Sequence, residues 1–351
     1  MVAPTFVRKL CIASLALCKI VLSLTLIYIS SDRTSTLQLW NTTGTRNSRM
    51  IANAPTSENS SGWNIITACR KPSLKILYFV HTAPKNFDKR QMLRKTIGDP
   101  GIASEVNSAV VFFVGVTPDL KERKTLLEEA ANEGDLVSFN FTDTYKNLSH
   151  KFINGARWIL DNCLLDAKSA IVKIDDDILV NVFALSSYLT SGAMAVTGMH
   201  CFMFKQTGPQ RKKWSKWYVS RKAYASNVYP AYCTGAAVIM QPSVLLTLYN
   251  AASQVPFFWV DDVYVYGMIG DFANVTLVDI SKYIVLRAHR RMPIEKVKPT
   301  VLFLHTGWTT ITKRNIHRLW QKFKRNKHVL WNKFNKDVQV YYRRIATPTK
   351  K

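Results

Sequence analysis

The chain of 351 residues is short of acidic side chains. It has 23 Asp and Glu against 48 Lys and Arg, which gives a formal charge of +25. This balance favours anionic partners such as nucleic acid, lipid headgroups, nucleotide phosphates or sulfated glycans, and charge alone does not choose among them. The chain has no internal repeat, and 47% of its residues are apolar. That apolar content excludes disorder over most of the length.

The six cysteines lack the close C-x-x-C spacing of a zinc site, which argues against a structural zinc ion. Two of them belong to an apolar N-terminal segment. The other four permit two disulfides in three possible pairings if the compartment is oxidising. These four are Cys69, Cys163, Cys201 and Cys233.

The N-terminal segment 10–29 is an apolar run of the length needed to cross a bilayer, about 20 residues. Basic residues precede it, so the positive-inside rule predicts a cytoplasmic tail over residues 1–9 and a lumenal remainder. A cleaved signal peptide is the alternative, but the run lacks the small-residue cleavage site that should follow. We therefore expect a signal anchor and a single-pass type II membrane protein.

Five glycosylation sequons agree with a lumenal location, which removes nucleic acid as a partner. They lie at Asn41, Asn59, Asn140, Asn147 and Asn274. Residues 30–71 are rich in Ser, Thr and Asn and predict a solvated lumenal stem. Residues 72–330 carry the periodic apolar patterns of a globular domain, and residues 331–351 form a basic tail. The tail is interpreted as a solvated face or as a surface attracted to an anionic acceptor.

Strands and helices alternate in the first half of the globular region, which predicts an α/β fold with a mainly parallel sheet covered on both faces. The expected strands are 74–81, 110–114, 135–141 and 169–174, and the expected helices are 121–133 and 148–163. The second half is less regular. It is expected to hold strands at 196–204 and 236–240 and helices at 242–252 and 261–269.

The last of the first four strands runs into the acidic triplet Asp175-Asp176-Asp177. Ligands bind beyond the carboxyl ends of strands in such sheets. Three adjacent carboxylates repel one another, and a hard divalent cation such as magnesium or manganese would relieve that repulsion. A solvated acidic turn is the alternative, but apolar runs on both sides of the triplet argue against it.

Several further segments follow in the order of one known family. Residues 141–151 (FTDTYKNLSHK) resemble its F-x-D-x-Y-x-N-L-T-x-K segment, and residues 89–98 (KRQMLRKTIG) resemble its R-x-x-x-R-x-T-W-G segment. Four more segments are similar to further segments of that family, namely 111–115, 216–220, 229–235 and 256–267. With the triplet, they resemble the β-1,3-galactosyltransferase and β-1,3-N-acetylglucosaminyltransferase family, glycosyltransferase family 31. The resemblance implies a GT-A type, Rossmann-like mixed sheet flanked by helices.

The resemblance also implies residue roles. Metal ligands would be Asp176 and Asp177, completed by His305, although a lone histidine is often structural. The donor nucleotide and its diphosphate would meet Arg94, Asp143, Lys151 and Asp175. Either Asp261 or Asp262 would take the proton from the acceptor hydroxyl, and Asp262 is favoured because the family holds that aspartate more steadily. The alternative is that this pair caps the helix that begins near residue 263.

Together these features predict an inverting, manganese-dependent β-1,3-hexosyltransferase of the Golgi membrane. It would transfer galactose, or N-acetylglucosamine, from a UDP-sugar to a glycan on protein or lipid. Three features depart from the family pattern and bear on which sugar is used. They are Ile97 in place of Trp, Ala236-Ala237 in place of a glycine-rich pair, and one extra residue in the DVYVYG segment. The alternatives are a fringe-like transferase acting on O-linked fucose and a catalytically silent member that binds glycans or acts as a chaperone.

Overall fold

The computed structural model describes residues 68–286 and 294–327. The expected cytoplasmic tail, anchor, most of the stem and the basic tail at 331–351 lie outside these residues. No helix within the described ranges has the length and apolar character needed to cross a membrane.

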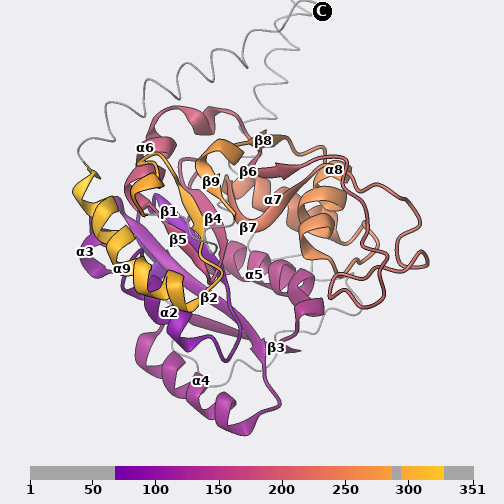
Figure 1. Cartoon of the computed structure of the whole chain (residues 1–351), viewed down its shortest axis with the longest axis horizontal. Helices are drawn as coiled ribbons and strands as arrows, with labels where there is room; N and C mark the ends of the chain where they lie inside the picture. The colour runs from indigo at the N-terminus through magenta and orange to yellow at the C-terminus, as the bar shows by residue number, and fades with distance from the viewer. Residues whose placement is uncertain (1–67, 287–293, 328–351) are drawn as a thin grey trace, which may run out of the picture. The chain divides into compact units, whose positions relative to one another are not determined.

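A mixed seven-stranded sheet forms the centre of the described body, in the order β3-β2-β1-β4-β7-β6-β8 (Figure 1). The first four strands in this order are parallel, and β7 pairs antiparallel with both β4 and β6. The strands are β1 (Ile76–His81), β2 (Ser108–Val116), β3 (Leu136–Thr142), β4 (Ala170–Asp175), β6 (Met199–Phe204), β7 (Tyr232–Met240) and β8 (Leu277–Asp279). The predicted α/β class with a mixed, helix-flanked sheet is confirmed.

A second, three-stranded sheet joins distant parts of the chain. Its order is β5-β10-β9, formed by β5 (Ile178–Val180), β10 (Phe303–His305) and β9 (Ile284–Val285). In the antiparallel register, His305 faces Ile178. Because β5 begins directly after the acidic triplet, this pairing holds the late histidine beside it.

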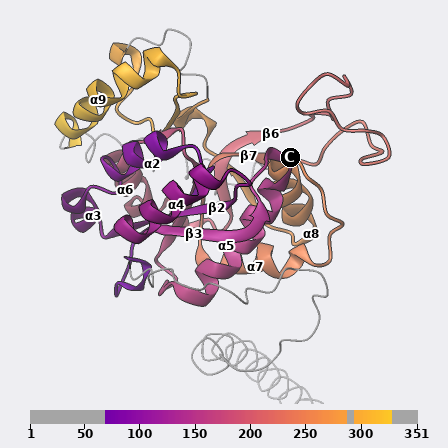
Figure 2. The same cartoon turned by 90° about the horizontal axis from the view of Figure 1, so that it is seen from below.

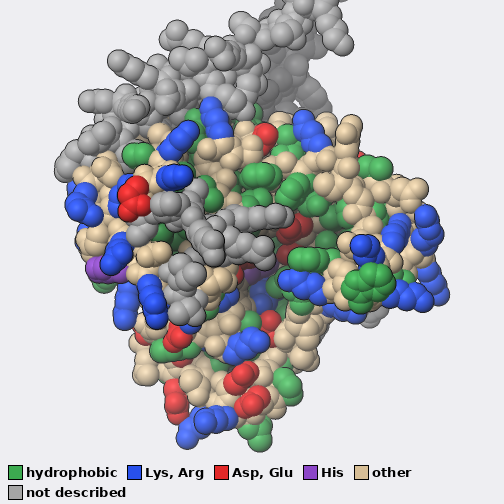
Figure 3. Space-filling model, viewed as in Figure 1, with side chains coloured by type: hydrophobic (Ala, Val, Ile, Leu, Met, Phe, Trp, Pro, Cys, Tyr) green, Lys and Arg blue, Asp and Glu red, His purple; other side chains and the backbone are tan. Residues whose placement is uncertain are grey.

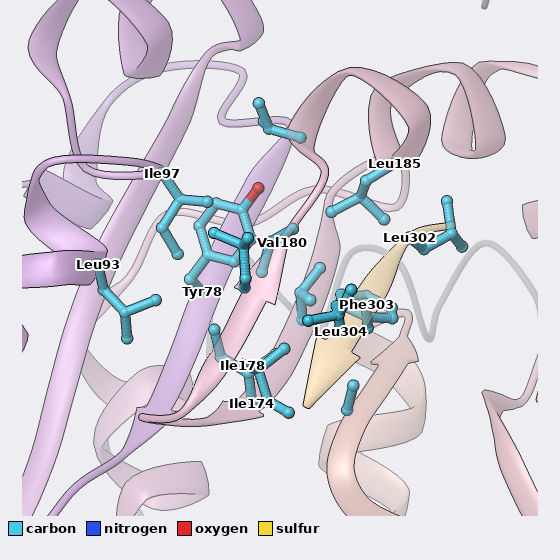
Figure 4. Packing of buried hydrophobic residues seen from close by; sticks show 14 of the residues in the cluster. Tyr78, Leu93, Ile97, Ile174, Ile178, Val180, Leu185, Leu302, Phe303 and Leu304 are labelled. Carbon is cyan, nitrogen blue, oxygen red and sulfur yellow. The ribbon is translucent and has the colours of Figure 1, made fainter. Parts of the chain in front are cut away.

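The two faces of the main sheet bury separate clusters of apolar side chains, as the alternation of a strand predicts. On β1, Tyr78 and Val80 point to one cluster, whereas Leu77 and Phe79 point to the other. Tyr78 is seen among the residues of the first cluster in Figure 4. Helices from both halves of the chain therefore cover both faces (Figure 2).

The first cluster is covered by α2 (Phe87–Arg94), α3 (Pro100–Val106), α4 (Leu120–Glu133), α6 (Val182–Thr190) and α9 (Thr310–Arg325). The second is covered by α5 (Leu148–Asn162), α7 (Pro242–Ala252) and the π-helix η4 (Asp262–Ile269), which continues into α8 (Gly270–Phe272). Short 3₁₀ turns are η1 (Ala68–Arg70), η2 (Tyr145–Asn147), η3 (Ala193–Ala195), η5 (Ser281–Tyr283) and η6 (Ile294–Lys296).

The pairing that the sequence left open is Cys69–Cys163 and Cys201–Cys233. The first bond ties the 3₁₀ turn before β1 to the end of α5, so the folded body includes Cys69, three residues before the start expected from the sequence. The second joins neighbouring strands β6 and β7 at the base of the long loop between them.

Candidate active site

The acidic triplet lies at the carboxyl end of β4, next to the carboxyl end of β1, where His81 is in register with Asp175. This is the edge at which ligands bind in open α/β sheets. The chain leaves β1 through Thr82 and enters α2, whose first turn returns toward the triplet. Two strand ends and one helix start therefore meet at the site.

Asp176 is the buried member of the triplet, with 5% of its surface exposed. Its carboxylate accepts hydrogen bonds from Thr82 Oγ1 at 2.7 Å, Asn86 Nδ2 at 2.8 Å and Lys89 Nζ at 2.8 Å. Burial raises the pKa of Asp176, and these donors oppose that rise. Both carboxylate oxygens are engaged, so Asp176 orients the loop after β1.

Asp177 faces outward. Its Oδ2 lies 3.3 Å from Lys89 Nζ, and its Oδ1 lies 3.3 Å from His305 Nε2. Burial disfavours the charged form, but the hydrogen bond to His305 and the charge of Lys89 outweigh it and lower the pKa of Asp177 to about 2. The backbone carbonyl of Asp177 accepts from Thr306 N and Oγ1. Asp177 is therefore a fixed, ionised carboxylate at neutral pH.

His305 is oriented by its second ring nitrogen. Nδ1 lies 2.7 Å from the carbonyl oxygen of Leu286, which can only accept, so Nδ1 carries a proton. This leaves Nε2 on the side of Asp177, in the arrangement that metal-binding histidines commonly have. The hydrogen bond to Asp177 is also the main cause of the raised pKa of His305.

The Asp177 and His305 pair fits two positions of a divalent cation, because neighbouring ligands of one ion lie about 3 Å apart. Asp176 fits less well, since its oxygens already accept three hydrogen bonds. No group of three or more His, Cys, Asp or Glu side chains is placed to hold a metal ion within the described ranges. Magnesium-type sites commonly use one or two protein carboxylates and take their remaining ligands from substrate phosphates and water.

Asp143 and Lys151 form a buried pair beneath the loop after β1. Lys151 Nζ donates to Asp143 Oδ2 at 2.8 Å and to the carbonyl oxygen of Thr82. The same Asp143 oxygen accepts from the backbone N–H of Gly115 at 2.6 Å. Burial lowers the pKa of Lys151 against the attraction of Asp143. The pair therefore fixes Thr82, which in turn holds Asp176.

Arg94 contacts a different set of carboxylates. Its guanidinium makes two 2.8 Å hydrogen bonds to Asp135 and one of 2.7 Å to Glu129, and Glu129 also binds the fully buried Arg90. Arg90 leads back to the site, because it donates to Thr82 Oγ1. The hydrogen bonds of Arg94 join α2, α4 and the start of β3, and its role toward a nucleotide stays a prediction.

Lys173 separates the triplet from the second acidic cluster, Asp261 and Asp262. Its Nζ donates to Asp175 Oδ1 at 2.7 Å and to the carbonyl oxygen of Gly235 at 2.5 Å. Burial opposes its charge, but Asp175 and Asp261 outweigh burial and raise the pKa of Lys173. A buried ammonium thus lies between two groups of carboxylates.

Asp261 and Asp262 are crowded carboxylates at the start of η4. Burial and repulsion from Asp175 raise the pKa of Asp261 to about 6, against the charge of Lys173. Burial and Asp261 raise the pKa of Asp262 well above its ordinary value. Gly235 permits this approach, because a Cβ there would lie 2.3 Å from Asp262 Oδ1. The cluster binds protons more readily than ordinary aspartates do.

The DVYVYG segment, in which the resemblance implies one extra residue, lies in the helix that begins at Asp262. Residues Asp262–Ile269 adopt a π-helix, and Asp261 makes no side-chain capping hydrogen bond. A π-helical turn holds one more residue than an α-helical turn and is common at functional sites. The capping interpretation of the pair is therefore wrong for Asp261.

Three site residues escaped the sequence reasoning. Lys89 contacts both Asp176 and Asp177. Lys173 lies inside an apolar strand, and a buried ammonium group needs carboxylate partners, so its place in the sequence is a signal that could have identified it. His81 is buried at the end of β1, and neither of its ring nitrogens has a hydrogen-bond partner within the described part of the chain. Burial, with the charges of Lys173 and Lys151, lowers its pKa, so it is neutral.

Comparisons with known proteins show the family of the chain. The family model described as galactosyltransferase matches residues 88–281, more than half of the chain. Human beta-1,3-galactosyltransferase 5 is 27% identical over 61% of this chain and 68% of its own length. The Drosophila melanogaster beta-1,3-galactosyltransferase brn is 31% identical, over 58% of this chain and 62% of its own.

A Danio rerio lactosylceramide 1,3-N-acetyl-beta-D-glucosaminyltransferase A is also similar, with 31% identity over 56% of this chain and 54% of its own. Among solved structures, a glycosyltransferase involved in the glycosylation of the major capsid of PBCV-1 matches with a TM-score of 0.37 and 12% identity, over 70% of this chain and 98% of that one.

Proposed function

Because the chain belongs to the galactosyltransferase family and is therefore a glycosyltransferase, we propose that it is an inverting, metal-dependent β-1,3-hexosyltransferase. Its donor is a UDP-sugar, with galactose ahead of N-acetylglucosamine, and its acceptor is a glycan on protein or lipid. The observation that carries the proposal is the pairing of a strongly ionised cluster, Asp177 with His305, and a proton-binding cluster, Asp261 with Asp262, at one sheet edge.

The first cluster suits the departing diphosphate. A bound manganese ion would neutralise the charge that develops on that leaving group. Asp177 and His305 would hold this ion, and Asp177 stays ionised because its pKa is about 2. Lys89, 3.3 Å from Asp177, adds positive charge at the same edge.

The second cluster suits the acceptor. A base that removes the proton of an acceptor hydroxyl works best with a pKa near the working pH. The pKa of Asp261, raised to about 6, meets this requirement, and burial and Asp261 raise the pKa of Asp262 in the same direction. Asp262 is the proposed base, since its carboxylate packs directly against Gly235, which fixes its position. Lys173 keeps enough positive charge nearby for at least one of the two to ionise.

The remaining expectations form part of the same proposal. The catalytic body adopts the GT-A arrangement, faces the Golgi lumen and is anchored by residues 10–29, so the donor arrives as a lumenal UDP-sugar. The names of the similar proteins, which include two galactosyltransferases, support galactose as the first donor to try.

The test uses the purified full-length chain with UDP-galactose, UDP-N-acetylglucosamine and a panel of β-galactoside and β-N-acetylglucosaminide acceptors, with and without manganese. We expect metal-dependent transfer with one donor, formation of a β-1,3 linkage read by NMR, and slow donor hydrolysis without acceptor. Glycan binding without transfer, hydrolysis or UDP affinity would instead identify a silent member of the family.

A further inference from the structure

The long loop between β6 and β7, residues 205–231, carries positive charge alone. It contains no Asp or Glu. Its basic residues are Lys205, Arg211, Lys212, Lys213, Lys216, Arg221 and Lys222. In Figure 1 the loop extends from the right side of the sheet, and Figure 3 shows blue side chains surrounding green ones over the same part of the surface. We call residues 205–231 the basic loop.

The basic loop is held in a defined conformation. The guanidinium of Arg211 donates to three carbonyl oxygens of the loop, those of Val219, Tyr224 and Ser226, at 2.8–3.0 Å. Val219 is buried, and the ring of Tyr224 packs 5.5 Å from that of Phe258 on the body. One arginine is thus used to build the loop, whereas the other basic side chains remain at its surface.

The outer part of the basic loop exposes tryptophan beside lysine. Trp214 is 84% exposed and Trp217 is 50% exposed. These exposed fractions are large, because tryptophan side chains are highly buried on average. Lys212 Nζ lies 5.9 Å from the ring centre of Trp214, and Lys216 Nζ lies 4.4 Å from that of Trp217. Within the described ranges, Lys212, Lys213 and Lys216 make no ion pair, so their charge is available to a ligand.

This surface continues to the proposed acceptor base. Trp217 Nε1 donates to the hydroxyl of Tyr145 at 2.7 Å, and the Tyr145 ring lies 6.3 Å from that of Trp259, edge to face. Trp259 precedes Asp261 by two residues. Aromatic rings therefore run from the loop surface to the catalytic edge.

We propose that the basic loop binds the acceptor, and that the acceptor is a sulfated glycan whose sugar rings lie on Trp214 and Trp217 and whose sulfate groups contact Lys212, Lys213 and Lys216. The inference rests on the proposed function and names its substrate class. Tryptophan presents a flat apolar face to the C–H face of a sugar, and clustered lysines match a repeated anion. Continuity with Asp262 favours an acceptor glycan over an acidic membrane surface.

The experiment compares N-acetyllactosamine oligosaccharides with the same oligosaccharides carrying 6-O-sulfate, using the full-length chain and its Lys212→Gln/Lys213→Gln variant. The unmodified protein is expected to prefer the sulfated acceptor. The loss of two exposed charge contacts is expected to weaken acceptor binding by roughly 2- to 30-fold in total. The KM of the variant for the sulfated acceptor should therefore be higher by that factor. Lys121→Gln/Lys124→Gln on α4 removes the same charge from an exposed helix face and should leave the preference intact.

Direct binding separates this inference from the proposed function. Retention of a heparin hexasaccharide should fall in Lys212→Gln/Lys213→Gln and in Trp214→Ala, and this is measurable even if no transfer is found. A chain that transfers sugar but shows equal KM values for both acceptors, before and after substitution, would overturn the inference alone. Loss of binding to phosphatidylserine vesicles with unchanged glycan binding would also overturn it, in favour of a membrane contact.

Discussion

Burial raises the pKa of the carboxyl groups in both acidic clusters at the carboxyl edge of the sheet, but the net shifts have opposite signs. Asp177 has a pKa of about 2, because His305 and Lys89 outweigh the cost of burying its charge. Asp261 and Asp262 have raised pKa values, because burial and their mutual repulsion outweigh Lys173. The residue type is the same in both clusters, so the surroundings decide which carboxylate holds charge and which binds a proton.

This difference is the pattern expected of a site that divides its chemistry between two carboxylate groups. A transferase needs fixed negative charge where a cation and diphosphate meet, and a weaker acid where a hydroxyl loses its proton. Lys173 lies between the clusters, bound to Asp175 at 2.7 Å, and keeps the two from acting as one acidic surface.

The largest expected effect is loss of the base. Asp262→Asn keeps the shape of the side chain and its packing against Gly235, but it cannot take a proton. We expect kcat for transfer to fall by about 10²–10⁴-fold, with little change in UDP affinity measured by calorimetry. Asp271→Asn, at an exposed position of α8, serves as the matched control. Full transfer activity in Asp262→Asn would remove the proposed division of roles.

Loss of the charged cluster should act through the metal. Asp177→Asn removes the ionised ligand and is expected to lower kcat by roughly 10²–10³-fold, and added manganese should recover part of the loss in a titration. Chelation of manganese should abolish transfer by the unmodified chain. It should also abolish any transfer that remains in Asp262→Asn or Asp177→Asn. An Asp177→Asn protein with an unchanged manganese requirement would contradict the assignment.

The pH dependence of transfer should reveal the proton-binding cluster once manganese is saturating, a condition that offsets the competition of protons for His305. Asp261 and Asp262 face each other, Lys173 and Asp175, and their base form is lost as pH falls through the raised pKa values, near 6 for Asp261. At saturating manganese, log kcat should therefore fall by up to about one per pH unit below that region. Asp177, ionised down to about pH 2, adds nothing there. A flat profile from pH 7 to pH 5 would exclude the pair as the base.

Motifs and periodicity were enough to predict β1–β4, β6, β7, α4, α5 and α7, whereas α2, α3, α6, α9 and the short strands β5, β8, β9 and β10 were not predicted. The run before the triplet is a buried strand because most of its residues are apolar and several are β-branched, and Asp175 is its last residue, with Asp176 and Asp177 directly after it. His305 was tied to the triplet only by resemblance. Its position depends on the antiparallel pairing of β10 with β5, which connects residues more than 100 positions apart and leaves no local pattern in the sequence.

Charged contacts were predicted less well than strands. Arg94 and Lys89 lie on the same short helix, yet Lys89 contacts the triplet whereas Arg94 contacts Asp135. The disulfide pairing was open for the same reason, since it depends on which strand and helix ends come together in space. Sequence patterns predict which face of an element is buried, whereas the partner of a long charged side chain depends on the assembled fold.

The smallest effect expected is on stability, and it has the opposite sign to the effect on activity. A carboxylate whose pKa is raised in the folded state stabilises it below the unfolded pKa, near 3.8, and this contribution is lost as pH rises through the folded pKa. Above that range, ionising the crowded pair costs free energy that Asp262→Asn avoids.

We therefore expect Asp262→Asn to raise the free energy of unfolding at pH 7.5, and to differ little from the unmodified chain at pH 4. Urea unfolding at both pH values measures this, with Asp271→Asn as the variant that should change neither. A gain at pH 7.5 beside a loss of transfer would mean that the fold tolerates strain at Asp262 for the sake of chemistry. Destabilisation at pH 7.5 would instead mean that Lys173, Asp261 and Asp262 form a stabilising ion network. Asp262 would then be an ionised carboxylate like Asp177, and the proposed difference between the two clusters would be wrong.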